Sequence, residues 1–331
     1  MTSSPLRLLG GEDVENGCFG IVGRHPLMLN LYASIRAAAQ HQVPVVIQGP
    51  TGSGKELVAR AIHGQSRASG RLICLNVAEL SDQLLEPGLF GSERGAFTGA
   101  VARPGLIEEA HGGTLFLDEA GDLPHSAQAK LLRALEYHTI RRVGSTRDRH
   151  VRFRLILSTM TPVDCLVASR QWREDFRYRV DGFTVPVPAL AQRTEDIPLL
   201  VDYFLKDLGH PELKLEQQNP LAGFAWPGNV RELLRVVERA VVHSGPRPVT
   251  VDDLVSAVID KCSVAAEPLQ DLSLKAAIRR HIEATMDRVG QDATAAARIL
   301  GLSPSALYHR LRTYRTLDSP QVTTKTSSPV S

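Results

Sequence analysis

The chain has few cysteines and no long apolar run, and each shortage excludes a class of protein. Its 331 residues include four cysteines, which lie tens of residues apart without the spacing of a zinc ribbon or a disulfide framework. No stretch approaches the roughly 18 consecutive apolar residues of a membrane-spanning helix, and the first residues lack the apolar core of a secretory signal. Since 43% of the residues are hydrophobic, the chain is not wholly disordered, and we expect a folded cytoplasmic protein.

Net charge is also low, at +2, but it is unevenly distributed. Residues 271–315 hold eight Lys/Arg against four Asp/Glu, so the rest of the chain is slightly acidic. A small basic unit on an acidic body predicts that the C-terminal end binds nucleic acid. The same excess also fits an ordinary solvated surface.

Apolar, β-branched runs alternate with helical patterns over the first two thirds of the chain. Such buried strands predict an α/β fold with a parallel sheet covered on both faces. The expected strands are 43–49, 71–76, 114–119, 153–159 and 183–188, and helical patterns between them include 55–63 and 127–137.

Beyond residue 190 the pattern becomes helical, with apolar stripes from Ile197 and after Asn229. An aperiodic linker, three further helical segments and a Ser/Thr/Pro-rich end follow. The predicted division is a short N-terminal tail at 1–18, an α/β part at 19–190, a helical subdomain at 191–257, a linker at 258–270, a C-terminal all-α domain at 271–316 and a disordered tail at 317–331.

A glycine-rich string follows the first strand and precedes a helix, the order that points backbone amides and a helix N-terminus at phosphates. The residue after its lysine is Glu56, where Ser or Thr normally contacts Mg²⁺, so a glycine-rich turn stays an alternative. The string matches GxxxxGK and consists of Gly49, Pro50, Thr51, Gly52, Ser53, Gly54 and Lys55.

Two acidic residues, Asp118 and Glu119, end the strand expected about sixty residues later. One carboxylate in such a place holds Mg²⁺ and the next polarises the water that attacks a phosphate. Two acids at a strand end also commonly cap the next helix. Together with the glycine-rich loop, they favour an ATP- and Mg²⁺-dependent hydrolase.

Several strings resemble one family, the sigma-54-dependent transcriptional activators, also called bacterial enhancer-binding proteins. The strings are LFGSERGAFTGA, GGTLFLDEAGDLP, QAKLLRALE, WREDFRYRV and WPGNVREL. The resemblance implies an AAA+ P-loop ATPase module over 19–257 with residues 191–257 as its lid, and a Fis-like helix-turn-helix domain at the C-terminus.

The same resemblance assigns roles around the nucleotide. It implies that Lys55 binds the β/γ-phosphates, Asp118 binds Mg²⁺ and Glu119 is the base. It also implies that Asn76 restrains Glu119 and that Arg231 closes the lid over the nucleotide. The family has Glu after the lysine, so Glu56 conforms to it. From the residues alone, Asn76 at a strand end is more often a turn former.

Arg173 and Arg179 resemble arginine fingers that reach a neighbour's γ-phosphate, which implies a ring, typically a hexamer. Guanidinium groups suit the spread charge of a transferring phosphate. The first sensor departs from the family, because Met160 follows Thr159 where an asparagine is usual. Thr159 can still hydrogen-bond near the γ-phosphate, but Met160 cannot replace an amide.

The GAFTGA string places one aromatic and one hydroxyl between small residues, so we expect a loop with an exposed apolar tip; a buried hairpin turn is the alternative. In the family this loop contacts sigma-54. Its residues here are Gly95, Ala96, Phe97, Thr98, Gly99 and Ala100.

The final helices carry the helix-turn-helix pattern ATAAARILGLSPSALYHRLRTY. The residues expected to face inward are Ala296, Ile299, Leu300, Leu307, Leu311 and Tyr314. A three-helix interaction module is the alternative. The residues expected to contact enhancer DNA, at base edges or phosphates, are Arg298, Ser305, His309, Arg310, Arg312 and Arg315.

The sequence therefore predicts a protein that binds enhancer DNA and uses ATP hydrolysis to convert the sigma-54 RNA polymerase closed complex into an open complex. The alternatives are a DNA-bound repressor or co-regulator that only senses nucleotide, and a small-molecule kinase that would leave the loop and terminal helices unexplained. Few residues precede the AAA+ match, so we expect control by an inhibitor in trans, a co-activator or paralogue, or abundance. Short relatives of this kind include phage-shock and type III secretion activators.

Overall fold

A computed structural model describes residues 17–264, except positions 67, 98, 212 and 214–219, together with residues 286, 296, 297 and 307. The chain separates into two units, residues 1–260 and 261–331. The elements below belong to the first unit, apart from the last turn of α10. Among the helices of the described residues, none combines the length and apolarity needed to cross a membrane.

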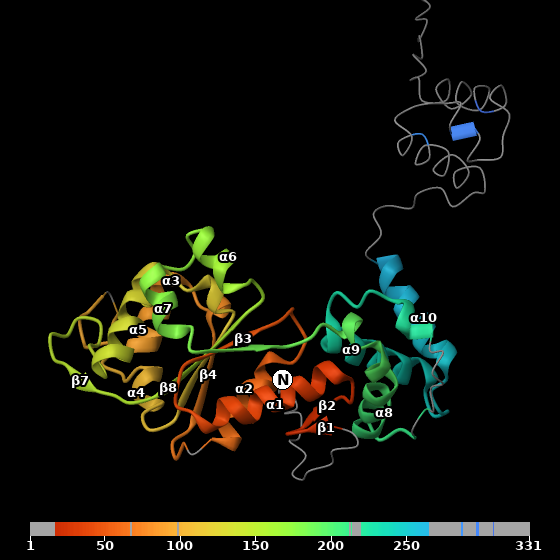
Figure 1. Cartoon of the computed structure of the whole chain (residues 1–331), viewed down its shortest axis with the longest axis horizontal. Coiled ribbons are helices and arrows are strands. Elements are labelled where there is room, and N and C mark those ends of the chain that lie inside the picture. Colours follow the sequence, from red (N-terminus) through yellow and green to blue (C-terminus); the bar gives the residue numbers. More distant parts are fainter. Residues whose placement is uncertain are drawn as a thin grey trace, which may run out of the picture. The chain divides into compact units, whose positions relative to one another are not determined.

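A five-stranded sheet forms the centre of the first unit, in the order β4-β5-β8-β3-β9, and every neighbouring pair is parallel (Figure 1). Each strand lies within a run that the sequence predicted, so the parallel α/β sheet is confirmed. The strands are β3 Val45–Gln48, β4 Leu72–Asn76, β5 Thr114–Asp118, β8 Arg154–Thr159 and β9 Phe183–Pro186.

Both faces of the sheet are covered, because successive strand residues point to opposite sides. Ile47, Phe116 and Ile156 pack in one apolar cluster with α1 (Pro26–Gln40) and α2 (Lys55–Gln65). Their neighbours Val46, Leu115 and Leu155 pack in a second cluster with the helices of the other face. These are α3 Asp82–Phe90, α4 Leu106–Glu109, α5 His125–Tyr137, α6 Val163–Ala168 and α7 Glu174–Val180.

A third apolar cluster holds the helical lid together. Its helices are α8 (Ile197–Asp207), α9 (Asn229–Ser244) and α10 (Val251–Val264). Residues 258–264, which we expected in the linker, belong to α10 and are helical. The buried Val258 continues the apolar face of α10 past residue 257, where the lid was expected to end.

Short elements complete the first unit. Gly17 and Cys18, expected in the N-terminal tail, already form β1 and pair with β2 (Ile21–Val22). The other short elements are β6 Thr139–Ile140, β7 Arg149–His150 and the 3-10 helices η1 Val77–Glu79, η2 Ala120–Asp122, η3 Leu190–Gln192, η4 Thr194–Asp196 and η5 Pro220–Gly223.

The sheet register brings the ends of four strands to one edge. Gln48 pairs with Thr159 across β3 and β8, and Asn76 pairs with Asp118 across β4 and β5. The segments that follow these strands therefore start side by side, at the carboxyl edge where open α/β sheets bind ligands.

Candidate nucleotide site

The glycine-rich loop between β3 and α2 forms a cradle for an anion. Gly52 and Gly54 have φ angles of +73° and +104°, which other residues rarely adopt. Ser53 is buried, and its Oγ has no hydrogen-bond partner within the described part of the chain. A loop at the N-terminus of α2, with an unpaired buried hydroxyl, fits the phosphates of a nucleotide.

Lys55 is the cation of this loop. Its side chain is only 6% exposed, and its Nζ lies 3.7 Å from Glu119 Oε1 and 3.4 Å from the Pro50 carbonyl oxygen. A buried ammonium requires such partners. Glu56, which the sequence grouped with the loop, instead lies on the exposed face of α2 and forms an ion pair with Arg60 at 2.6 Å.

The two carboxylates stand at the end of β5, as predicted, and share a partner that the sequence did not reveal. Asp118 is the last residue of β5, and Glu119 follows with φ +52° and ψ +45°. Left-handed backbone is uncommon in a residue other than glycine and concentrates at functional sites. The buried hydroxyl of Ser158 donates to Asp118 Oδ1 and accepts the Glu119 N–H at 3.3 Å. The only sequence signal was a serine at the end of an otherwise apolar strand.

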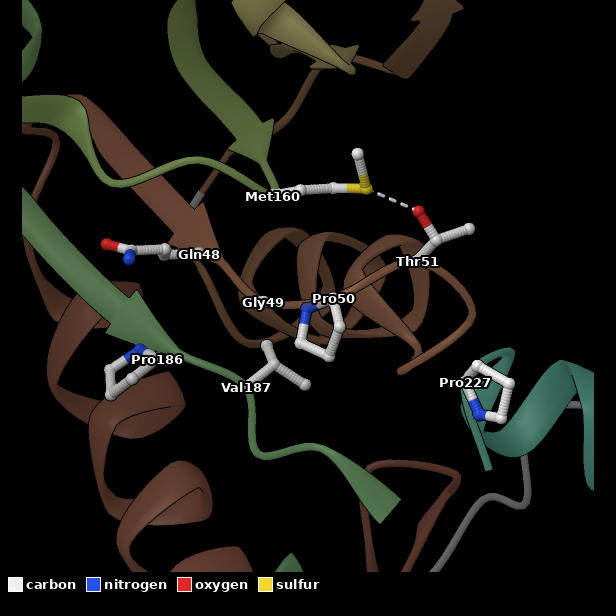
Figure 2. A pocket seen from close by; sticks show the side chains of 8 residues that line it. All are labelled: Gln48, Gly49, Pro50, Thr51, Met160, Pro186, Val187 and Pro227. Atoms are coloured by element: carbon white, nitrogen blue, oxygen red, sulfur yellow. Dashed lines mark hydrogen bonds between the residues drawn. The ribbon is translucent and has the colours of Figure 1, made fainter. Parts of the chain in front are cut away.

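The residues predicted as the first sensor lie at the end of β8: Thr159 is its last residue and Met160 follows it. Thr159 is buried, and its hydroxyl bonds to the backbone of Thr161. Met160 is 52% exposed, and its sulfur is contacted by the Thr51 hydroxyl of the glycine-rich loop. Figure 2 shows this contact at the edge of a pocket. The pocket has a volume of about 550 Å³ and is lined by residues from the strand ends, the glycine-rich loop and the lid: Gln48, Gly49, Pro50, Thr51, Met160, Pro186, Val187 and Pro227.

Asn76 caps a turn instead of contacting Glu119. Its Oδ1 accepts the Ala78 N–H at 3.1 Å, and its Nδ2 donates to Glu79 at 3.2 Å. These bonds fix η1, which is the turn-forming behaviour typical of asparagine. Among hydrogen bonds of the described residues, none joins Asn76 to Glu119, so its predicted restraint stays a prediction.

The lid contacts the glycine-rich loop directly. The backbone N–H of Arg231, on α9, donates to the Gly52 carbonyl at 3.2 Å. The buried side chain of Asn229 donates to the Thr51 carbonyl at 2.9 Å. Sequence reasoning selected Arg231 and missed Asn229, although both lie in the string WPGNVREL.

The two arginines proposed as fingers lie on α7 and around its start. Arg173 is 42% exposed and forms two hydrogen bonds with Asp175, at 2.9 and 2.7 Å. Arg179 donates to the Leu135 carbonyl of α5 at 2.6 Å. Within the described residues, neither bonds to the glycine-rich loop or to the carboxylates, so the structure does not bring them into the site of their own subunit.

The GAFTGA string lies in a loop between α3 and α4 that is closed at its base. Ser92 and Arg103 form an antiparallel bridge there, and Gly144 of the β6–β7 connection approaches Ala96 too closely to carry a Cβ. Phe97 is 42% exposed, and a hydrogen bond from the Ala100 N–H to its carbonyl closes the turn. The string is therefore an exposed turn and not a buried one; Thr98 lies outside the described residues.

Four charged side chains brace the base of this loop, and we call them the loop-base network: Glu93, Glu108, Arg142 and Arg149. Arg142 binds Glu108 at 2.7 Å and Glu93 at 3.4 Å, and Arg149 lies 3.3 Å from Glu93 and 3.7 Å from Glu108. Because each acid contacts both arginines, the loop is linked to the β6–β7 connection. Sequence reasoning did not find this network.

In the second unit, Ala296 and Leu307 are buried, as their predicted inward positions require. The predicted DNA contacts lie outside the described residues and stay predictions: Arg298, Ser305, His309, Arg310, Arg312 and Arg315.

Three family descriptions match the chain in succession. Residues 21–186 match the Sigma-54 interaction domain, residues 191–269 the AAA+ ATPase lid domain, and residues 279–314 the Fis family of bacterial regulatory proteins. The first match spans half of the chain and contains the glycine-rich loop, both carboxylates and the GAFTGA loop. The chain belongs to the sigma-54-dependent transcriptional activators.

Known regulators are similar to this activator over most of its length. It is 40% identical over 301 residues to the transcriptional regulatory protein ZraR of Escherichia coli O157:H7, across 88% of the chain and 68% of ZraR. It is 44% identical over 248 residues to the transcriptional regulatory protein GlrR of Escherichia coli K12, across 72% of the chain and 56% of GlrR.

A solved structure shares the fold. NtrX from Brucella abortus, crystallised in complex with ATP, is similar with a TM-score of 0.67 and 34% identity, across 88% of this chain and 69% of NtrX. The sigma-54-dependent activator thus has an AAA+ ATPase module with a helical lid and a Fis-type DNA-binding domain. The predicted fold class, ATP dependence and activator function are confirmed, and the repressor alternative is not favoured.

Proposed function

We propose that this activator hydrolyses ATP at a site completed by a neighbouring copy, and that hydrolysis moves the GAFTGA loop against sigma-54 RNA polymerase. The observation that carries the proposal is the exposed Phe97 at the tip of a loop whose base is braced by the loop-base network. An apolar tip on a braced loop is suited to push on a partner, because load at the tip reaches the body of the ATPase module.

The chemistry follows from the residues around the glycine-rich loop. Its amides and Lys55 hold the phosphates of ATP, and Asp118, oriented by Ser158, would hold Mg²⁺. The metal supplies positive charge that offsets charge developing on the phosphates. Glu119 accepts a proton from the water that attacks the γ-phosphorus, the bond to the β–γ bridging oxygen breaks, and ADP and inorganic phosphate leave. Arg231 of the lid contacts the bound nucleotide.

Arg173 and Arg179 complete the site of the adjacent subunit. Arg173 supports this role because its guanidinium is exposed and its partner Asp175 is its own near neighbour, so it can exchange that carboxylate for a phosphate. A finger supplied in trans requires the ATP site to lie between subunits, and we propose that the subunits form a ring hexamer.

The Fis-type unit brings this ring to enhancer DNA. Ser305, His309 and Arg310 contact base edges in the major groove, and Arg298, Arg312 and Arg315 contact phosphates. The activator works in the cytoplasm. Its activity is controlled by a protein that acts in trans or by a paralogue in the ring.

Transcription in vitro with sigma-54 polymerase, on a promoter with an upstream site, tests the proposal. We expect Lys55→Ala to abolish both ATP turnover and open-complex formation. Thr98→Ala should keep turnover within about twofold and reduce open complexes at least about tenfold, because it removes loop contact and no nucleotide contact. Equal loss of both activities in Thr98→Ala would contradict the role of the loop.

A further inference from the structure

The lid reaches the glycine-rich loop through a strained turn. Trp226 and Asn229, on either side of Pro227 and Gly228, have φ angles of +48° and +52° and are 2% and 3% exposed. Left-handed backbone in two buried residues other than glycine persists only where the surroundings fix it. The turn is closed by a hydrogen bond from the Asn229 N–H to the Trp226 carbonyl at 2.9 Å.

The Asn229 side chain uses both ends of its amide. Its Oδ1 accepts the Leu190 N–H at 2.8 Å, and its Nδ2 donates to the Thr51 carbonyl at 2.9 Å. Leu190 begins η3, on the connection between β9 and the lid, and Thr51 belongs to the glycine-rich loop. One buried side chain therefore ties together the loop, the connection to the lid and the start of α9.

The backbones are also in direct contact at this seam. A Cβ at Gly52 would lie 2.3 Å from the Gly228 carbonyl oxygen, a distance that no other residue tolerates at this position without movement. In the first turn of α9, the Arg231 N–H donates to the Gly52 carbonyl at 3.2 Å. The glycine-rich loop and the base of α9 are thus packed without intervening side chains.

We infer that Asn229 is a positioning residue for ATP: its amide fixes the lid turn on the glycine-rich loop and thereby sets where Arg231 stands over the nucleotide. The inference rests on the proposed contact of Arg231 with ATP. Because the Asn229 bond reaches the loop through a backbone carbonyl, any shift of the loop on phosphate binding is passed to α9 and to Arg231.

Asn229→Asp removes the hydrogen bond to the Thr51 carbonyl at 2.9 Å, together with a longer one that the same Nδ2 donates to the Pro227 carbonyl at 3.4 Å. Aspartate keeps the size of the side chain, tolerates left-handed backbone and retains an acceptor for Leu190, but it places an oxygen against the Thr51 carbonyl. We expect the KM for ATP and the Kd for ADP to rise about tenfold, the value of one good hydrogen bond in binding. Asn30→Asp, on the exposed face of α1, is the matched control and should change neither constant.

A double-variant cycle separates positioning from a merely structural role. If Asn229 acts through Arg231, adding Asn229→Asp to Arg231→Ala should weaken ADP binding by no more than about twofold beyond Arg231→Ala alone. Asn229→Gly keeps the left-handed backbone and loses all three side-chain hydrogen bonds, to Leu190, Thr51 and Pro227. It replaces Asn229→Asp in the cycle if that variant does not fold, as judged by thermal unfolding.

Two results would overturn the inference: multiplicative losses in the double variant, or an Asn229 variant that unfolds at lower temperature yet binds ATP and ADP like the wild type. If Arg231→Ala binds nucleotide normally, the proposed contact of Arg231 fails first and the inference falls with it. If Arg231→Ala weakens nucleotide binding but the double variant shows multiplicative losses, the role of Asn229 is rejected and the contact of Arg231 with ATP stands.

Discussion

At the scale of single residues, Ser158 contacts both acidic residues of the candidate site through one hydroxyl. Its hydroxyl donates to Asp118 and accepts the N–H of Glu119, whose backbone is left-handed. Ser158 therefore fixes the relative positions of the carboxylate that we propose as the Mg²⁺ ligand and the neighbour that we propose as the base. Fixed polar groups are what makes such sites efficient, because little reorganisation accompanies the reaction.

We predict that Ser158→Ala raises the Mg²⁺ concentration for half-maximal ATP turnover several-fold, by about threefold to tenfold, and lowers kcat by a similar factor. The cause is the loss of the hydrogen bond that orients Asp118. Steady-state turnover across a Mg²⁺ titration checks this. Ser34→Ala on the exposed face of α1 is the control, and a Mg²⁺ profile unchanged from wild type in Ser158→Ala would show that Asp118 needs no such support.

At the scale of elements, the loop-base network connects the GAFTGA loop to the β6–β7 connection. Burial alone raises the pKa of Glu108, but the hydrogen bond and charge of Arg142, with smaller contributions from the Gly105 N–H and Arg149, outweigh it and hold that pKa below its ordinary value. The unfolded chain therefore takes up a proton on Glu108 at a higher pH than the folded chain does. The resulting stability is present above the ordinary pKa and is lost as the pH falls through the folded value.

From this sign we predict the behaviour of Glu108→Gln. Its thermal unfolding midpoint should lie about 2 to 4 °C below wild type at neutral pH, and the two proteins should approach each other as the pH falls to about 4. Unfolding scans at several pH values measure both differences. Glu136→Gln on the exposed face of α5 is the control, and a difference in Glu108→Gln that is the same at every pH would contradict the ion pair as its cause.

At the scale of the whole molecule, the two arginines that we propose as fingers do not reach the nucleotide site of their own subunit within the described residues. The hydrogen bonds and ion pairs of Arg173 and Arg179 in the described structure lead to α5 and Asp175, away from Lys55 and Glu119. In the function that we propose, a complete site combines two copies, one that supplies the glycine-rich loop and another that supplies the arginine. This arrangement makes activity a property of the assembly.

Mixing two inactive variants tests this arrangement. Lys55→Ala subunits keep an intact finger and Arg173→Ala subunits keep an intact loop, so about a quarter of the seams in a random closed ring combine both intact parts. We predict that the mixture recovers ATP turnover toward that fraction, although each variant alone is inactive. Lys55→Ala mixed with Glu119→Ala is the control and should recover nothing, because both defects lie on the same side of the seam. Equal recovery in both mixtures would contradict a shared site.

Much of this protein was predictable from its sequence because the signals are local. Strand and helix periods, the glycine-rich loop, the acids that end β5 and the GAFTGA string each occupy a few consecutive residues. The parallel strands therefore lie where the apolar runs predicted them, and the family follows from short strings. Local signals also misled: Glu56 follows the lysine of the glycine-rich loop yet pairs with Arg60, and α10 continues to Val264 although the predicted lid ends at residue 257.

Packing alone decided which side chains meet. Ser158 and Asp118 are 40 positions apart, Arg142 and Glu108 are 34 apart, and Asn229 and Thr51 are 178 apart. Such pairs depend on strand order, helix packing and the placement of the lid, none of which a short sequence window encodes. The sequence by itself thus determined that the chain binds ATP and acts with sigma-54. The tertiary structure decided which buried hydroxyls, amides and charges meet at the candidate site, because those contacts arise only when distant segments pack.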